Sequence, residues 1–110
     1  TRRMWPPLRG EVWDVDLPRV GAHPCVVLAV NALSARVSEV AVAMITSTPG
    51  PRSTRVPIGA DAGLTRYDES YVDVMSVHTV PLDRFQRRRG RTSATELLAV
   101  ETALRLVLGL

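Results

Sequence analysis

The chain has 110 residues, 45% of them hydrophobic, which suits one small domain that buries a core and has modest stability alone. It contains no apolar run of about eighteen residues and no apolar stretch at its start, so we expect no transmembrane helix, no signal peptide and a cytoplasmic location. All fourteen basic residues are arginine, and the net charge of +3 permits a polyanionic partner without requiring one.

The first half of the chain predicts three strands. Residues 1–8 are expected to form an extended lead-in to a single domain over residues 9–110. Residues 11–17 alternate apolar and acidic side chains, as in a half-buried strand. Residues 24–31 are almost continuously apolar, as in a central strand buried on both faces, and residues 37–46, rich in Val and Ile, predict a third strand.

The third predicted strand ends in three hydroxyl side chains. Thr46–Thr48 are followed by Pro49, Gly50 and Pro51, which cannot continue a central strand. We therefore expect the hydroxyls at the mouth of a loop. A short return strand is predicted over residues 52–58, and two further strands over residues 70–75 and 77–80.

The last segment changes to helical spacing. Ser93 and Glu96 match a capping box, and Gly109 is placed to end the helix. Glu101 and Arg105 stand four residues apart and predict an ion pair on the solvent side. The apolar stripe, which indicates core packing rather than a binding site, comprises Leu97, Val100, Leu104, Val107 and Leu108. The whole pattern predicts a mainly β (α+β) fold of five to seven short antiparallel strands, a small barrel or strongly bent sheet, with a C-terminal amphipathic helix packed on it.

A dense basic cluster, Arg87–Arg91, precedes this helix. Its simpler interpretation is a solvated turn. The alternative is a contact for phosphate or for an acidic peptide.

Few residues offer chemistry. The single cysteine, Cys25, is expected to fill core space, and no metal-ligand spacing, phosphate-binding loop or Gly-x-Ser-x-Gly turn is present, so we expect neither a metal nor a cofactor. The polar residues at predicted strand ends are His23, Thr46, Ser47, Thr48, His78 and Thr79. Two histidines with nearby arginines suit metal-free cleavage of a phosphodiester, with one imidazole as base and the other as acid. The alternative is that each histidine has only a structural role.

Several stretches, in order along the chain, resemble the MazF/PemK family of toxins from type II toxin–antitoxin pairs. They are residues 9–17, 21–31, 43–48, 77–85 and 90–108. The resemblance implies an SH3-like barrel with a C-terminal helix, usually a homodimer. It also implies a metal-independent, sequence-specific endoribonuclease that cuts single-stranded RNA to leave a 2′,3′-cyclic phosphate and a 5′-hydroxyl. A small antitoxin with an acidic segment is the implied partner.

The resemblance also implies site residues. The family places an arginine before the proline that opens the second strand, where this chain has His23 before Pro24. Thr46 matches the family's hydroxyl at the end of the third strand, and His78 occupies its second basic position. We therefore assign His23, Thr46 and His78 as catalytic candidates. The two histidines form a base and acid pair, or one transfers protons while the other binds phosphate, and Thr46 orients the scissile phosphate. A bell-shaped rate profile between about pH 5 and 8 is expected.

The remaining RNA-binding candidates are Arg19, Ser47, Thr48, Arg52 and Thr79. Two other functions stay open: a toxin of the same fold that binds a protein such as DNA gyrase without cutting RNA, and a non-toxic binding module. The low aromatic content, 5%, argues against a stacking platform for single strands.

Overall fold

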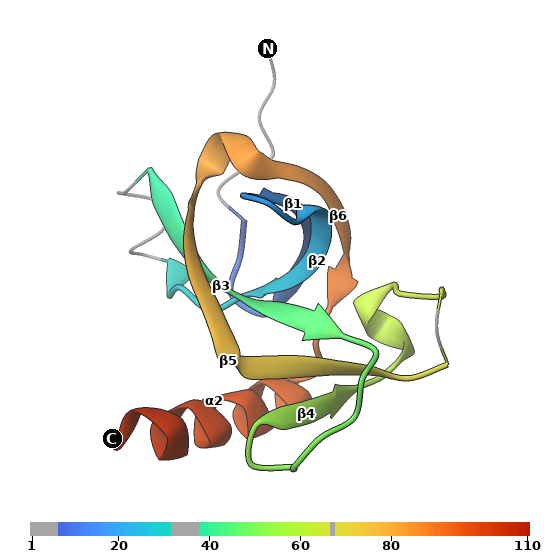
Figure 1. Ribbon diagram of the computed structural model, residues 1–110, viewed down its shortest axis with the longest axis vertical. Coiled ribbons are helices and arrows are strands. Elements are labelled where there is room, and N and C mark those ends of the chain that lie inside the picture. The colour runs from blue at the N-terminus through green and yellow to red at the C-terminus, as the bar shows by residue number, and fades with distance from the viewer. Residues whose placement is uncertain (1–6, 32–37, 67) are drawn as a thin grey trace.

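One sheet, curled on itself, makes up most of the molecule (Figure 1). The computed structural model describes residues 7–31, 38–66 and 68–110; residues 1–6 of the expected lead-in and residue 37, the expected start of the third strand, lie outside these ranges. The strands within the described residues are β1 (Glu11–Leu17), β2 (Gly21–Val27), β3 (Glu39–Thr46), β4 (Arg55–Ile58), β5 (Ser70–Pro81) and β6 (Phe85–Arg91). The helical elements are two short 3₁₀ turns, η1 (Ala60–Ala62) and η2 (Leu82–Arg84), and the helix α2 (Ala94–Leu108).

The strands follow the order β4-β5-β3-β2-β1-β6, and all neighbours are antiparallel. The helix α2 lies beneath β4 and β5 (Figure 1). The expected fold class, an SH3-like barrel of five to seven antiparallel strands with a C-terminal helix, is confirmed. No helix in the described ranges is long and apolar enough to cross a membrane.

The strand β5 replaces the two strands predicted over residues 70–75 and 77–80, and that prediction is wrong. The start of this 12-residue strand pairs with β4 on one side and β3 on the other, and after a sharp corner it continues along β3 (Figure 1). Asp73 holds the corner, because its carboxylate accepts hydrogen bonds from the Met75 N–H at 3.0 Å and the Ser76 hydroxyl at 3.1 Å. Ser76, at which the two predicted strands were separated, therefore lies in the bend of one continuous strand.

Two buried clusters lie on opposite faces of the sheet. Inside the barrel, Trp13 is 6% exposed and meets Phe85 edge to face, with ring centroids 5.8 Å apart. On the other face Val26 packs with Val100 and Ala103 of α2. Within β2, Cys25 and Val27 face the first cluster and Val26 the second, which confirms a strand buried on both faces. The strand runs from Gly21 to Val27 rather than over residues 24–31.

The arginine cluster is a strand, and its prediction as a solvated turn is wrong. β6 pairs with β1, and its arginines meet the acidic residues of that strand. The three pairs are Arg88 with Glu11 at 2.7 Å, Arg89 with Asp14 at 3.1 Å, and Arg84, in the preceding turn, with Asp16 at 2.9 Å. Cross-strand pairing of opposite charges, rather than an apolar face, therefore marks this strand.

The helix begins and ends where the sequence predicted. Ser93 and Glu96 form the capping box, and Gly109 caps the other end at φ +72°. The Glu96 carboxylate also accepts from the Gly59 N–H at 2.6 Å, which ties the helix to the loop after β4. The predicted stripe is partly wrong, because Leu108 is 63% exposed.

The predicted ion pair between Glu101 and Arg105 is also wrong. Glu101 pairs instead with Arg9, at 2.6 Å. Arg9 precedes β1 and reaches the helix across the fold, a tertiary contact that helical spacing cannot reveal.

The return strand after residue 51 begins later than predicted, at Arg55 rather than residue 52. The N–H groups of Thr54 and Arg55 both donate to the Pro51 carbonyl, at 2.9 and 2.8 Å, so residues 51–54 form a turn.

We expect Glu11 to stabilise the barrel at neutral pH and to lose this effect in acid. Burial would raise the pKa of Glu11, but the Leu8 N–H, Arg88 and Trp13 all donate to its carboxylate and together hold the pKa below its usual range. A carboxyl with a lowered folded pKa stabilises above its unfolded value of about 4.3, and this contribution is lost as the pH falls through the folded pKa.

Melting temperatures of wild type and Glu11→Gln between pH 7 and 3 measure this effect. The variant should melt several degrees lower at pH 7, and the difference should shrink below about pH 4.3. Glu39→Gln, at an exposed position, is the control. A difference independent of pH would contradict the prediction.

Candidate functional site

A pocket of about 460 Å³ opens where β2 begins and β3 ends. Three of the residues singled out from the sequence line it together: His23, Thr46 and Ser47. Its lining also includes Asp14, Arg66 and Arg89. Two guanidinium groups and one carboxylate give the pocket a positive balance, which favours an anionic ligand.

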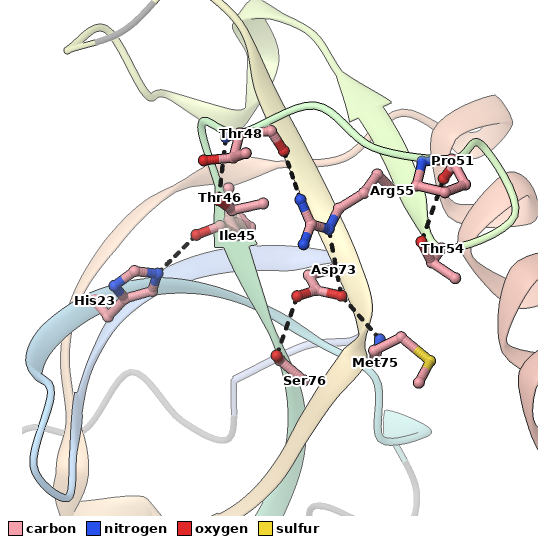
Figure 2. A network of polar contacts seen from close by, with 10 residues as sticks. All are labelled: His23, Ile45, Thr46, Thr48, Pro51, Thr54, Arg55, Asp73, Met75 and Ser76. Carbon is pink, nitrogen blue, oxygen red and sulfur yellow. Dashed lines mark hydrogen bonds and ion pairs between the residues drawn. The ribbon is translucent and has the colours of Figure 1, made fainter.

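His23 is held against the end of β3. Its Nε2 lies 2.7 Å from the carbonyl oxygen of Ile45, the residue before Thr46 (Figure 2). Because a carbonyl only accepts, Nε2–H is the donor, and in the neutral ring this leaves Nδ1 as an acceptor. The imidazole is thus fixed beside Thr46 with one nitrogen able to take a proton.

Thr46 has its hydroxyl oriented by the turn that follows it. The Thr48 N–H donates to the Thr46 Oγ1 at 3.1 Å, a short side-chain-to-backbone turn. The hydroxyl therefore acts as an acceptor toward the protein, and its own proton can be donated to a bound anion.

Arg55 holds this turn in place from β4. Its Nη1 donates to the Thr48 carbonyl at 2.7 Å, and its Nε lies 3.6 Å from Asp73 Oδ1 (Figure 2). Asp73 is the residue that shapes the corner of β5. One guanidinium thus connects the turn after Thr46 with the bend of the neighbouring strand.

Arg89 supplies positive charge in a fixed position. Its Nη1 contacts both oxygens of Asp14, at 3.1 and 3.2 Å, and its Nη2 donates to the Gly63 carbonyl at 3.2 Å. A cation held by three acceptors needs little rearrangement when a ligand binds, the condition for effective electrostatic stabilisation.

The structure does not bring the other candidates into this pocket. His78 pairs with Val42, four residues before Thr46 on β3, or about 13 Å along the strand. Thr79 is exposed opposite Ala41. The last three lie apart from the pocket: Arg19 in the β1–β2 turn at φ +67°, Thr48 one residue beyond the lining, and Arg52 in a neighbouring hollow. A base and acid pair of His23 and His78 is therefore not formed within one chain.

Cys25 lies next to this region in sequence but is no nucleophile. Burial, with a smaller effect of the Asp14 charge, raises the pKa of its thiol to about 12. The thiol thus stays protonated at neutral pH, as expected for a residue that fills core space.

The sequence did not single out Asp14, Arg66 or Arg89 as site residues. Arg89 stood in the cluster interpreted as a solvated turn or, alternatively, as a contact for phosphate or an acidic peptide, and Asp14 was placed only by strand alternation. Residues 11–16 contain three acidic residues and residues 84–89 contain several arginines. This complementary charge could have indicated that the two segments pair. Nothing in the local sequence marks Arg66.

Comparisons of sequence and of structure with known proteins all point to one toxin family. Residues 8–108 match the family described as PemK-like, MazF-like toxin of type II toxin–antitoxin systems. Endoribonuclease MazF1 of Mycobacterium bovis is 30% identical over 104 residues, 94% of each chain. Probable endoribonuclease MazF5 of Mycobacterium tuberculosis is 33% identical over 100 residues, 89% of each chain. A solved endoribonuclease in complex with its cognate antitoxin, from a mycobacterial species, superposes with a TM-score of 0.85 and 30% identity, covering 96% of this chain and 97% of that one.

Fold and pocket thus define a small toxin-type β-barrel with a positively charged site at the exit of its third strand. The match extends from the start of β1 to the end of α2, so it includes every element that lines the pocket. The chain belongs to the PemK/MazF family of type II toxin–antitoxin toxins.

Proposed function

We propose that this chain is the toxin of a type II pair and cleaves single-stranded RNA as a metal-independent, sequence-specific endoribonuclease. The observation that carries the proposal is the pocket that joins His23, Thr46 and Arg89. Relatives that cover about nine-tenths of the chain bear the name endoribonuclease, which supports the same activity here.

The proposed reaction uses the substrate's own hydroxyl. His23 Nδ1 takes the proton of the 2′-OH, O2′ bonds to phosphorus, and the P–O5′ bond breaks. The leaving 5′ oxygen takes up one proton, returned by His23 or solvent, which gives a 2′,3′-cyclic phosphate and a 5′-hydroxyl. The Thr46 hydroxyl donates to a non-bridging oxygen while Arg89 stabilises the charge that grows on phosphorus.

We also propose a homodimer and an antitoxin partner, in the cytoplasm. Large apolar side chains are exposed on β5 and α2: Met75 at 64%, Val77 at 45%, Leu98 at 62% and Leu106 at 68%. Such side chains suit coverage by a second copy or by an antitoxin with apolar and acidic residues. A solved relative carries its cognate antitoxin, which supports this partner class. Sedimentation that shows only monomers at micromolar concentration would contradict the homodimer.

The test is cleavage of short single-stranded RNA by the purified protein in the presence of EDTA. The expected result is fragments with 5′-hydroxyl and cyclic phosphate ends, formed more slowly by about a hundredfold or more with His23→Ala. Intact RNA alongside growth arrest in cells would overturn the proposal and favour a toxin with a protein target.

We expect Arg55→Ala to lower kcat about tenfold or more with a smaller change in KM, because the Thr46–Thr48 turn loses its anchor and small misplacements of catalytic groups are costly. Arg105→Ala removes the same charge from an exposed helix position and serves as the control. Arg55→Lys keeps one donor and should recover part of kcat. Equal activity of Arg55→Ala and Arg105→Ala would contradict a positioning role.

A further inference from the structure

A second hollow adjoins the catalytic pocket and has a different chemistry. It measures about 380 Å³, within the usual range for small-molecule sites, and is called the Tyr71 pocket below. The lining residues that matter for its chemistry are Arg52, Arg55, Pro57, Asp68, Glu69, Ser70 and Tyr71. Ser70 also lines the catalytic pocket, so the two spaces share a wall.

Strand pairing fixes the relation between the two pockets. Tyr71 is paired with Thr46 of β3 on one side and with Pro57 of β4 on the other. Directly paired residues point to the same face of a sheet, and neighbouring strands are about 4.8 Å apart. A flat apolar surface, the Tyr71 ring and the Pro57 ring, therefore begins one strand away from the hydroxyl proposed to contact the scissile phosphate.

A hydrogen bond from its hydroxyl fixes the position of the Tyr71 ring. Its hydroxyl donates to a carboxylate oxygen of Glu69, two residues earlier. The hydrogen bond to the Glu69 carboxylate raises the pKa of Tyr71, so the phenol stays neutral. The contact leaves the second oxygen of Glu69 able to accept a hydrogen bond from a ligand.

Charge distinguishes the ligand of this pocket from that of its neighbour. Asp68 and Glu69 offset the charges of Arg52 and Arg55 in this lining, so it lacks the positive balance of the catalytic pocket, and the carboxylate oxygens can accept from ring or amino N–H groups. Arg52, exposed at the rim, carries donors that suit carbonyl and ring-nitrogen acceptors. A neutral heterocycle with donors and acceptors on its edge meets both requirements, and nucleobases have this chemistry.

We propose that the Tyr71 pocket holds a nucleobase next to the scissile phosphate and selects it, with Tyr71 as the stacking surface and Glu69 and Arg52 as the groups that contact its edge. The inference rests on the proposed function, because it takes the substrate to be single-stranded RNA. It adds the residues that set sequence preference.

The test uses equilibrium binding and cleavage in parallel. Binding is measured with short RNAs that carry a 2′-deoxy nucleotide at the cleavage position, which removes the attacking hydroxyl, and with each of the four bases at the neighbouring positions. Wild type should favour one base at one position. Tyr71→Ala should weaken binding of the preferred RNA about tenfold, and Tyr71→Phe should lose much less because the ring remains.

Glu69→Gln should change which base is preferred by about tenfold, since an amide offers a donor where the carboxylate only accepts. Glu39→Gln, the same change at an exposed position at the start of β3, should leave the preference as in wild type. Mapping of the 5′-hydroxyl ends from a mixed RNA pool should show the altered base at the same position.

The outcomes separate the two proposals. Cleavage by wild type with unchanged preference in Glu69→Gln and unchanged binding in Tyr71→Ala would overturn the subsite and keep the nuclease. Base-selective binding that depends on Tyr71 without any cleavage would keep the subsite and overturn the nuclease. No binding of any RNA would overturn both.

Discussion

RNA cleavage is expected to fall by about a hundredfold or more when His23 is replaced by alanine, because the variant lacks the only imidazole that lines the catalytic pocket in the described part of the chain. His23→Gln sharpens the test. Its side-chain N–H can still donate to the Ile45 carbonyl, as Nε2 does at 2.7 Å, but it cannot take a proton. Activity close to wild type in this variant would contradict the role of His23 as a base.

His78→Ala is the matched control for this prediction. His78 lies opposite Val42, outside the pocket, so its loss should change the rate by about threefold or less. A loss as large as that of His23→Ala would show that His78 reaches the reacting groups in an assembly of chains. Initial rates on one RNA, with melting temperatures to verify folding, measure both variants.

Replacement of Gly63 by alanine is expected to destabilise the fold by about 3 kcal/mol or more and to lower the melting temperature by more than about 10 °C. Gly63 has φ +77°, and a Cβ atom there would stand 2.0 Å from the Arg89 carbonyl oxygen. The backbone of β6 would have to move, and with it the strand that carries Arg89 into the pocket.

Gly21→Ala separates steric overlap from backbone strain. Gly21 has nearly the same φ, +81°, but no atom lies within 4 Å of a Cβ placed there. Its substitution should therefore cost only about 1 kcal/mol, the penalty of a left-handed conformation with a side chain. Thermal unfolding of both variants is the measurement, and equal losses would mean that the contact with β6 is unimportant.

The sequence predicted the parts of the fold that follow an apolar period. The strand around Trp13, the buried run around Val26 and the helix capped by Ser93 were all found in this way. It failed for β6, whose arginines pair with acids of β1, and for β5, where a bend at Ser76 was predicted as a break. The partners of the β6 arginines lie 75 and 77 residues away, and the β5 bend depends on side-chain hydrogen bonds of Asp73, so the alternation of apolar residues reveals neither.

The sequence also predicted only part of the candidate site. Their places at predicted strand ends and the family resemblance singled out His23, Thr46 and Ser47, and all three line one pocket. His78 does not join them, because strand pairing places it opposite Val42. Asp14 and Arg89 depend on contact between residues 75 positions apart, which only the closed barrel creates.

The pairing of β1 with β6 also determines when, during synthesis of the chain, the pocket can be completed. Glu11 can pair with Arg88 only after 77 further residues have been synthesised. At about 5–20 residues per second this takes roughly 4–15 s. Before β6 is made, β1 lacks this partner strand and the pocket lacks Arg89. We therefore expect a chain that ends before β6 to leave RNA intact, because it lacks Arg89 and the strand that pairs with β1.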